Sequence, residues 1–361
     1  MQSNYKPIGD YIRLIDNRNS DLAVSELLGV SINKTFIPSV ANVIGSDMAN
    51  YKIIRKNQFA CSLMQVRRDK KIPVALYSSE QPAIISQAYP VFEIIDSNTL
   101  LPEYLMMWFS RSEFDREACF YAVGGVRGSL EWDDFCKMQL PIPSLTKQQE
   151  AVDEYNIIQR RIDLNKQFCE KLEETAQTLY RKYFVDDIDE ENLPEGWRWG
   201  KLGELIDIKY GKSYFHLKEG EIPLYGSGGL MGKVDKAIYN KPSVLIPRKG
   251  TLSNIMFVNI PFWCVDTMFY SIFKNDLNGY YSYYILKQLD FDALNQGSAV
   301  PSMTTVFLND IKVLLPEIEI LRRFNSSIHK IISQKEILEQ HNLKLNEFQS
   351  LLLTKMGRKE N

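Results

Sequence analysis

Two long stretches of this 361-residue chain carry the same pattern of apolar residues. In the first stretch, from Tyr155 to Tyr183, the pattern recurs at alternating spacings of three and four residues, as in a coiled-coil seam. The second stretch, from Ile328 to Met356, keeps most of this stripe 173 residues later. Two matching helices of this length predict a duplicated chain with internal symmetry.

The predicted seam contains both apolar and polar residues. Its members are Tyr155, Ile158, Ile162, Asn165, Leu172 and Leu179 in the first helix, and Ile328, Ile331, Leu338, Asn342, Leu345 and Leu352 in the second. The polar positions Asn165, Lys335 and Asn342 either set the register of the pair or face solvent or a partner subunit. We favour register-setting for Asn165 and Asn342. Replacing Asn165 by Leu is then expected to raise thermal stability and loosen pairing specificity.

The similarity between the halves extends upstream of the helices, with an offset that shrinks steadily along the chain. The matched segments are Gly9-Asp10-Tyr11-Ile12 with Gly203-Glu204-Leu205-Ile206, Arg55-Lys56-Asn57 with Arg248-Lys249-Gly250, Tyr104 and Phe114 with Tyr281 and Phe291, and Leu140-Pro141 with Leu315-Pro316. Asn57 and Gly250 both suit a left-handed turn. A steady drift across several landmarks indicates duplication of the whole half.

The sequence predicts an α+β fold of two small β-rich domains, each followed by a long helix. With 45% hydrophobic and 12% aromatic residues, the chain can bury two cores. We expect strands near 51–54, 73–77, 90–95, 244–246 and 268–273, and shorter helices at 102–114 and 281–291. A capping box at Thr146 and Gln149 predicts the start of the first long helix. The predicted divisions are 1–145, 146–185, 186–316 and 317–361.

Composition favours a folded protein of the cytoplasm without metal or disulfide chemistry. No apolar run approaches the ~20 residues of a membrane span, and the first ten residues do not resemble a signal peptide. The five cysteines include no C-x-x-C pair and are expected to be reduced thiols. Only three histidines are present, which leaves little for a metal cluster or a catalytic triad.

Two short segments resemble catalytic motifs but depart from them. Gly226 to Lys233 is one residue too long for a phosphate-binding loop, and Val234 stands where Ser or Thr is required, so a turn is predicted. Asn259-Ile260-Pro261-Phe262 lacks the second proline of the adenine methyltransferase tetrapeptide, and no glycine-rich cofactor loop accompanies it. The chain is therefore expected to have no catalytic residues.

The opening of the second half completes a family pattern. Leu193-Pro194-Glu195-Gly196-Trp197 follows an acidic hinge at 186–191, and a Leu-Pro pair precedes each long helix. Together with the duplication, these features resemble the specificity (S) subunit of type I restriction-modification enzymes over essentially the whole chain. The first half departs from this pattern, because it begins Lys6-Pro7-Ile8-Gly9 without the L-P-x-G-W phrase.

The resemblance implies two target recognition domains, each reading one half of a split sequence in double-stranded DNA. It also implies that the two helices pack antiparallel as a spacer and that the subunit is non-catalytic. Two modification subunits bind S-adenosylmethionine and methylate adenine, and the assembly can recruit two restriction subunits that use ATP and magnesium. Helices of ~57 Å would separate the readers by about one and a half turns of DNA. Because the two halves differ in sequence, an asymmetric target is expected.

Candidate DNA contacts are polar residues in the loops of each half. Phosphate contacts require cations, and base edges are read by Arg, Lys, Asn, Gln, Ser or Thr. A net charge of −2 does not exclude such binding, because local basic loops can carry it. The candidates are Asn33, Lys34, Arg67, Arg68 and Arg127 in the first half, and Lys212, Tyr214, Ser227, Arg248, Ser302 and Thr304 in the second.

Two alternatives remain open from the sequence. The chain could be a recognition-domain relative of an adenine DNA methyltransferase, or a coiled-coil interaction protein without DNA affinity. The near-neutral charge permits the latter. The absence of cofactor and catalytic motifs favours the DNA-recognition subunit over the enzyme.

Overall fold

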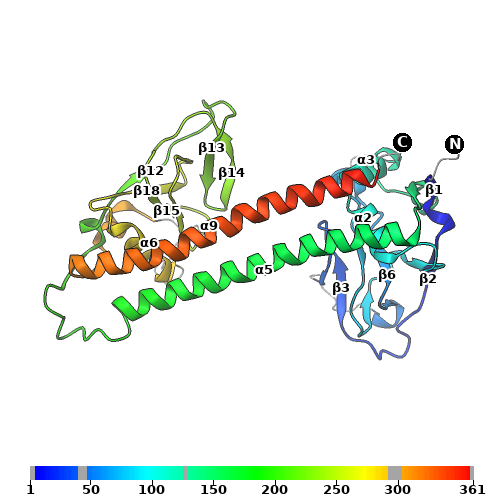
Figure 1. The fold of residues 1–361 in the computed structure, drawn as a ribbon, viewed down its shortest axis with the longest axis horizontal. Helices are drawn as coiled ribbons and strands as arrows, with labels where there is room; N and C mark the ends of the chain where they lie inside the picture. Colours follow the sequence, from blue (N-terminus) through cyan, green and yellow to red (C-terminus); the bar gives the residue numbers. More distant parts are fainter. Residues whose placement is uncertain (1–4, 40–46, 125–127, 292–302, 358–361) are drawn as a thin grey trace. The chain divides into compact units, whose positions relative to one another are not determined.

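The computed structural model describes residues 5–39, 47–124, 128–291 and 303–357 (Figure 1). The chain divides into two compact units, one of residues 1–165 with 340–361 (unit 1) and one of residues 166–339 (unit 2). Each unit contains a β-rich domain and part of both long helices, α5 (Leu145–Phe184) and α9 (Ile318–Lys355). The predicted domain divisions follow the chain instead and stay a prediction.

Unit 1 contains one two-stranded sheet and two four-stranded sheets. The first pairs β1 (Tyr5–Pro7) with β10 (Gln139–Pro141). The second has the order β2 (Ile12–Ile15), β9 (Val91–Ile94), β6 (Gln58–Cys61), β7 (Val74–Leu76). The third has the order β4 (Phe36–Pro38), β3 (Leu27–Val30), β8 (Ala83–Ile85), β5 (Lys52–Ile54). All neighbours are antiparallel except β3 and β8, which are parallel.

Unit 2 repeats this strand order, except that no strand among its described residues corresponds to β5. Its sheets are β11 (Arg198–Lys201) with β19 (Lys312–Leu315); β12 (Ile206–Tyr210), β18 (Met268–Phe273), β15 (Ser243–Pro247), β16 (Met256–Val258); and β14 (Gly229–Val234), β13 (Ile222–Gly226), β17 (Trp263–Cys264). The parallel pair recurs as β13 with β17. The shared order, including the single parallel pair, supports the predicted duplication.

The strand order corrects one of the matched sequence segments. Arg55, Lys56 and Asn57 lie before β6, whereas Arg248, Lys249 and Gly250 follow β15, the strand that occupies the position of β6. The segment equivalent to Arg248–Gly250 is therefore the connection after β6, which contains Arg67 and Arg68. The two turns share a left-handed residue, with φ of 65° at Asn57 and 85° at Gly250. That likeness reflects turn geometry rather than a common position.

The helices agree with the predicted pattern in most places and differ in three. The helix expected at 102–114 is two helices, α2 (Pro102–Phe109) and α3 (Ser112–Tyr121), because Arg111 is extended with ψ of 139°. The helix expected at 281–291 is α6 (Asn278–Gln288). Helix α5 begins at Leu145, and the Ser144 hydroxyl, not Thr146, accepts the Lys147 amide at 3.5 Å.

The remaining helical segments among the described residues are short. They are α1 (Val66–Asp69), α4 (Trp132–Lys137) and α8 (Thr305–Asp310), with 3-10 turns at Ile8–Asp10, Met48–Asn50 and Leu202–Glu204. Within the described residues, no helix has both the length and the apolar character that a membrane span requires.

Each unit has its own core, in which large aromatic side chains are fully buried. Phe59, Phe92 and Phe109 form the centre of unit 1, and Phe59 stacks on Phe92 with ring centroids 5.1 Å apart. In unit 2, Phe184 at the end of α5 packs against Phe324 of α9, with ring centroids 4.9 Å apart. Burying one such side chain stabilises a fold by roughly 1.5–3 kcal/mol. These contacts fix the helix segments to the sheet of their own unit.

Candidate nucleic-acid interface and helix seam

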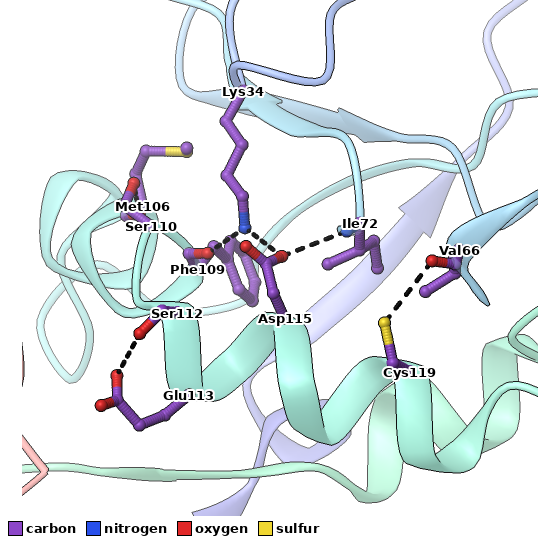
Figure 2. A network of polar contacts seen from close by, with 10 residues as sticks. All are labelled: Lys34, Val66, Ile72, Met106, Phe109, Ser110, Ser112, Glu113, Asp115 and Cys119. Atoms are coloured by element: carbon purple, nitrogen blue, oxygen red, sulfur yellow. Dashed lines mark hydrogen bonds and ion pairs between the residues drawn. The ribbon is translucent and has the colours of Figure 1, made fainter. Parts of the chain in front are cut away.

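The turn between β3 and β4 presents Asn33 to solvent and turns Lys34 inward. The Lys34 ammonium donates to the backbone oxygen of Phe109 and to Asp115 Oδ1 at 2.7 Å, and the Asp115 carboxylate also accepts the Ile72 amide at 3.1 Å (Figure 2). Burial lowers the pKa of Lys34, and the Asp115 carboxylate opposes that shift. Lys34 thus anchors the turn, and Asn33 is the residue exposed on it.

Helix α1 carries the basic pair Arg67 and Arg68 on one side of α3. Arg67 Nη1 donates to the Gly124 oxygen at 3.3 Å, and Arg68 forms two hydrogen bonds with Asp69 at 2.7 and 3.1 Å. The thiol of Cys119 on α3 contacts the Val66 oxygen at 3.5 Å (Figure 2). Arg127 lies outside the described residues. Because Asp115 and Cys119 both belong to α3, this helix supports the β3–β4 turn and α1 together.

In unit 2, the β13–β14 turn stands where the β3–β4 turn stands in unit 1, and it carries Ser227. The predicted turn lies at the start of the segment from Gly226 to Lys233, where Gly226 pairs with Gly229, and residues Gly229 to Lys233 belong to strand β14. The Asn254 amide donates to the Ser227 oxygen at 2.8 Å and fixes the turn. Asn33 and Ser227 therefore occupy equivalent hairpins, although nothing in their sequence surroundings aligns them.

The other candidates of unit 2 converge on the turn at 264–267. The Lys212 amide donates to the Cys264 oxygen at 3.0 Å, and the Arg248 amide donates to the Thr267 oxygen at 2.8 Å. The Arg248 guanidinium also lies over the Tyr210 ring, 5.6 Å from its centroid. Tyr214 stacks on Phe215 at 4.7 Å between ring centroids. These contacts bring loops from distant parts of the sequence to one face.

The candidate Thr304 lies at the start of α8. The Thr304 hydroxyl accepts the Phe307 amide at 3.2 Å and caps α8, so this oxygen is engaged in the fold. The neighbouring Met303 amide donates to the Arg248 oxygen at 2.9 Å, which places Thr304 beside the other candidates. Ser302 lies outside the described residues. As DNA contacts, all candidates of both units remain predictions.

Sequence reasoning missed two exposed residues at this face. Phe215 is 86% exposed, and Asp266 is exposed in the turn that holds Lys212 and Arg248. The available signal for Phe215 was a large apolar side chain in the polar loop after β12. Asp266 had no such signal, because its position follows from tertiary contacts. Within the described ranges, no group of His, Cys, Asp and Glu side chains could hold a metal ion.

In unit 1, a hydrogen-bonded pair of asparagines, Asn165 and Asn342, joins α5 to α9. Asn165, only 4% exposed, donates from Nδ2 to Asn342 Oδ1 at 2.8 Å, and Asn342 Nδ2 donates to the Ile162 oxygen at 3.4 Å. About two turns further along α9, Gln349 Nε2 donates to Gln159 Oε1 at 2.9 Å. Contacts move backward on α5 as they move forward on α9. The two helix segments of unit 1 are therefore antiparallel.

The seam of unit 2 contains an ionic triad. Glu173 accepts hydrogen bonds from Lys287 at 2.6 Å and from Lys335 at 2.9 Å, and its side chain is 16% exposed. Burial by itself would raise the pKa of Glu173, but the two ammonium groups outweigh burial and hold the pKa low. Correspondingly, the pKa of both lysines is raised. The triad joins α5, α9 and α6 in one unit.

The predicted seam residues share one property in the structure: each is buried or half-buried. They are Tyr155, Ile158, Ile162, Asn165, Leu172, Leu179, Ile328, Ile331, Leu338, Asn342, Leu345 and Leu352. Polar seam positions pair with one another instead of facing solvent. This arrangement favours the register-setting interpretation of Asn165 and Asn342.

The second half of the chain matches a known family model. Residues 194–357 match the family model described as the type I restriction modification DNA specificity domain. The type I restriction enzyme MjaIX specificity subunit of Methanocaldococcus jannaschii is 21% identical over 291 residues, 68% of this chain and 67% of that protein. The HindI specificity subunit of Haemophilus influenzae is 29% identical over 105 residues, 28% of this chain and 23% of that protein.

Solved structures extend the likeness to the whole chain. The S subunit of a type I restriction-modification system from M. genitalium has a TM-score of 0.61 at 17% identity, covering 99% of this chain and 96% of that one. A chain from a study of assembly and conformational transition of the type I system has a TM-score of 0.52 at 16% identity, covering 99% and 98%. The α+β fold of two β-rich domains and two long helices is as predicted and is shared with these S subunits. These comparisons agree with the resemblance found in the sequence: residues 194–357 match the type I DNA specificity domain, and nearly the whole chain shares the fold of type I S subunits.

Proposed function

We propose that each β-rich domain of this chain reads one half of an asymmetric, bipartite target in double-stranded DNA. The observation that carries this proposal is the repeated strand order with different side chains on equivalent loops. Asn33 stands on the β3–β4 turn where Ser227 stands on the β13–β14 turn, and the connection after β6 carries Arg67-Arg68-Asp69 where the connection after β15 carries Arg248-Lys249-Gly250. Two domains with the same strand order but different side chains on equivalent loops are expected to bind different base sequences, so the two half-sites should differ.

The long helices are proposed to set the gap between the half-sites. Helix α5 has 40 residues, which correspond to about 60 Å at 1.5 Å per residue. This length lies between one and two turns of B-DNA. The Asn165–Asn342 hydrogen bond supports a fixed helix register, because a one-turn slip would separate the two amides and leave them buried without partners. A fixed register implies a fixed gap.

The helices are also proposed to dock two modification subunits. In unit 1, Ile157 and Leu164 of α5 and Leu343, Phe348 and Leu351 of α9 are exposed. Because 157 and 164 lie two turns apart, they share one face of α5. Exposed apolar positions of this kind suit a protein interface. The modification subunits would supply S-adenosylmethionine and adenine methylation, restriction subunits would supply ATP and magnesium chemistry, and this chain would supply no catalytic residue.

A gel-shift assay tests the recognition step. The chain is purified with its modification subunit and mixed with genomic fragments or random duplexes of equal length. We expect a shift that selects certain sequences and that requires the chain. A complex that shifts all duplexes equally would contradict the proposal, and methyl transfer by the isolated chain would favour a methyltransferase relative.

Long-read sequencing of methylated adenines identifies the target directly. Genomes from cells with and without this gene are compared. We expect one split motif that disappears when the gene is deleted, and its two halves and gap give the specificity of both domains. Unchanged methylation after deletion would contradict the proposal.

A further inference from the structure

Unit 2 contains a hollow of about 340 Å³ at the face where its candidate DNA contacts converge. Three segments form its walls: the loop from Ser213 to Phe215, the hairpin turn from Gly226 to Met231, and the turn from Val265 to Thr267. The Arg248 amide is hydrogen-bonded to Thr267 of the third segment, and the Lys212 amide is hydrogen-bonded to Cys264 just before it. The hollow therefore lies among cations, as a site for a polyanion would.

The walls of the hollow are held in place before any ligand binds. The Val265 amide donates to the Tyr225 oxygen at 3.0 Å, and the Trp263 indole donates to the Lys212 oxygen at 3.0 Å. A side chain at Gly211 would lie 2.1 Å from the Val265 oxygen, so the loop after β12 and the 264–267 turn are in close backbone contact. Such a rigid scaffold suits a reader of base edges.

The hollow is lined by apolar side chains, by the hydroxyl-bearing residues Ser213, Ser227 and Thr267, and by the Asp266 carboxylate. Phe215 and Met231 are exposed and form the apolar part of the wall. The Asp266 carboxylate has no hydrogen bond or ion pair with any residue that the structure describes, although Arg248 Nη1 donates to the Asp266 backbone oxygen at 3.2 Å. An unpaired carboxylate on a DNA-facing surface is repelled by phosphates, so its partner there must be a donor.

The hydrogen-bond donors that each base presents in the major groove determine which base the Asp266 carboxylate can recognise. A carboxylate accepts hydrogen bonds but cannot donate, so it cannot read guanine N7 and O6 or thymine O4. Adenine offers its N6 amino group beside the N7 acceptor, which would repel a carboxylate. Cytosine offers the N4 amino group without an adjacent acceptor. The Asp266 carboxylate is therefore best matched to cytosine.

We infer that this hollow reads a cytosine in the half-site assigned to unit 2, with Asp266 accepting from its N4 amino group and Phe215 contacting the methyl group of a neighbouring thymine. The inference rests on the proposed function, since it assigns a base to one of the two readers. Asp266 and Phe215 are specificity-determining residues, and Lys212 and Arg248 hold the DNA backbone nearby.

The test uses the full complex with its modification subunits and duplexes carrying the target found by methylation mapping. Each base pair of both half-sites is replaced in turn, and binding is measured by competition. The variant Asp266→Asn replaces an acceptor with an amide that matches adenine. We expect it to shift the preference at one position of one half-site from cytosine toward adenine by about tenfold or more. Phe215→Ala is expected to weaken the preference for thymine at a neighbouring position only.

The matched control is Asp276→Asn, an exposed aspartate of unit 2 that does not line the hollow. It should leave both half-sites unchanged. The inference is overturned if Asp266→Asn keeps the wild-type preference at every position, or if it weakens binding to all duplexes equally. A wild-type complex without any sequence preference would instead overturn the proposed function, so the two failures are distinguishable.

Discussion

The side-chain amide of Asn165 donates a 2.8 Å hydrogen bond to the side-chain oxygen of Asn342. From the sequence alone, Asn165→Leu was expected to raise thermal stability. The hydrogen bond reverses this expectation, because leucine would leave the half-buried amide oxygen of Asn342 without its donor. We expect the single variant to lose about 1–3 kcal/mol of unfolding free energy. The double variant with Asn342→Leu should regain this loss, since two apolar residues can pack across the seam.

Chemical denaturation of the three variants, both singles and the double, measures the coupling between the two asparagines. The double variant should also show looser helix pairing, read as a variable gap in the methylated motif. A single Asn165→Leu variant that is more stable than the wild type would contradict the hydrogen bond as a stabilising contact.

The ionic triad around Glu173 is expected to stabilise unit 2. Glu173→Gln leaves Lys287 and Lys335 without a countercharge, and we expect a loss of about 1–3 kcal/mol. Glu174→Gln is the matched control, because Glu174 forms an exposed pair with Lys171 at 2.7 Å. Such exposed pairs contribute about 0–1 kcal/mol. Equal effects of the two variants in thermal unfolding would contradict the importance of the triad.

The same triad predicts the pH dependence of stability. The lowered pKa of Glu173 makes its contribution complete above the unfolded carboxyl value of about 4.3, and the contribution is lost as pH falls through the folded pKa. The raised pKa of both lysines makes their contribution complete below about 10.4, and it is lost as pH rises through the folded values. The stability difference between wild type and Glu173→Gln should therefore be largest between these limits. A constant difference between pH 3 and pH 7 would contradict this assignment.

The Lys34–Asp115 ion pair is expected to be structural. Its side chains are 9% and 11% exposed, so Lys34→Met leaves a buried carboxylate without its cation, at a cost of about 3–5 kcal/mol. Lys56→Met is the control, because Lys56 pairs with Glu80 on the surface. Denaturant unfolding should separate the two variants clearly. If Lys34→Met keeps wild-type stability and only weakens DNA binding, Lys34 is a DNA contact instead.

Arg248 is expected to contact a phosphate. Arg248→Ala should weaken binding of the complex to all duplexes and reduce the slope of log affinity against log salt by about one. Lys274→Ala serves as control, since Lys274 faces Asp207 at 3.6 Å on another part of unit 2. Binding is measured across a salt series. An unchanged slope with altered base preference would make Arg248 a base reader.

The long helices could be predicted from sequence because their pattern is local and repeats over about eight turns. Every predicted seam residue is buried or half-buried, since a spacing of three and four residues leaves one face to the partner. The strand positions near 52–54, 74–76 and 91–94 could also be predicted, because each contains β-branched residues, accompanied by Leu or Phe in the last two. Local patterns thus carry the secondary structure.

The candidate site was harder to predict from the sequence, because its contacts join residues that lie far apart in the chain. Lys34 was chosen as an exposed cation, yet its partner Asp115 lies 81 positions away. The break between α2 and α3 at Arg111 interrupts a segment whose residues all suit a helix. The hollow beside Asp266 depends on three loops that meet only in the folded unit. Charge and residue type alone cannot distinguish an anchoring cation from one that faces a ligand.

The pairing of β1 with β10, and of β11 with β19, places the first and last strands of each recognition domain side by side. Neighbouring strands lie about 4.8 Å apart, whatever the segment between them contains. A recognition domain is therefore joined to the helices through two adjacent attachment points. Recombination between related genes could exchange the whole segment as a cassette, and a new DNA specificity would arise in one event while the helices kept their spacing.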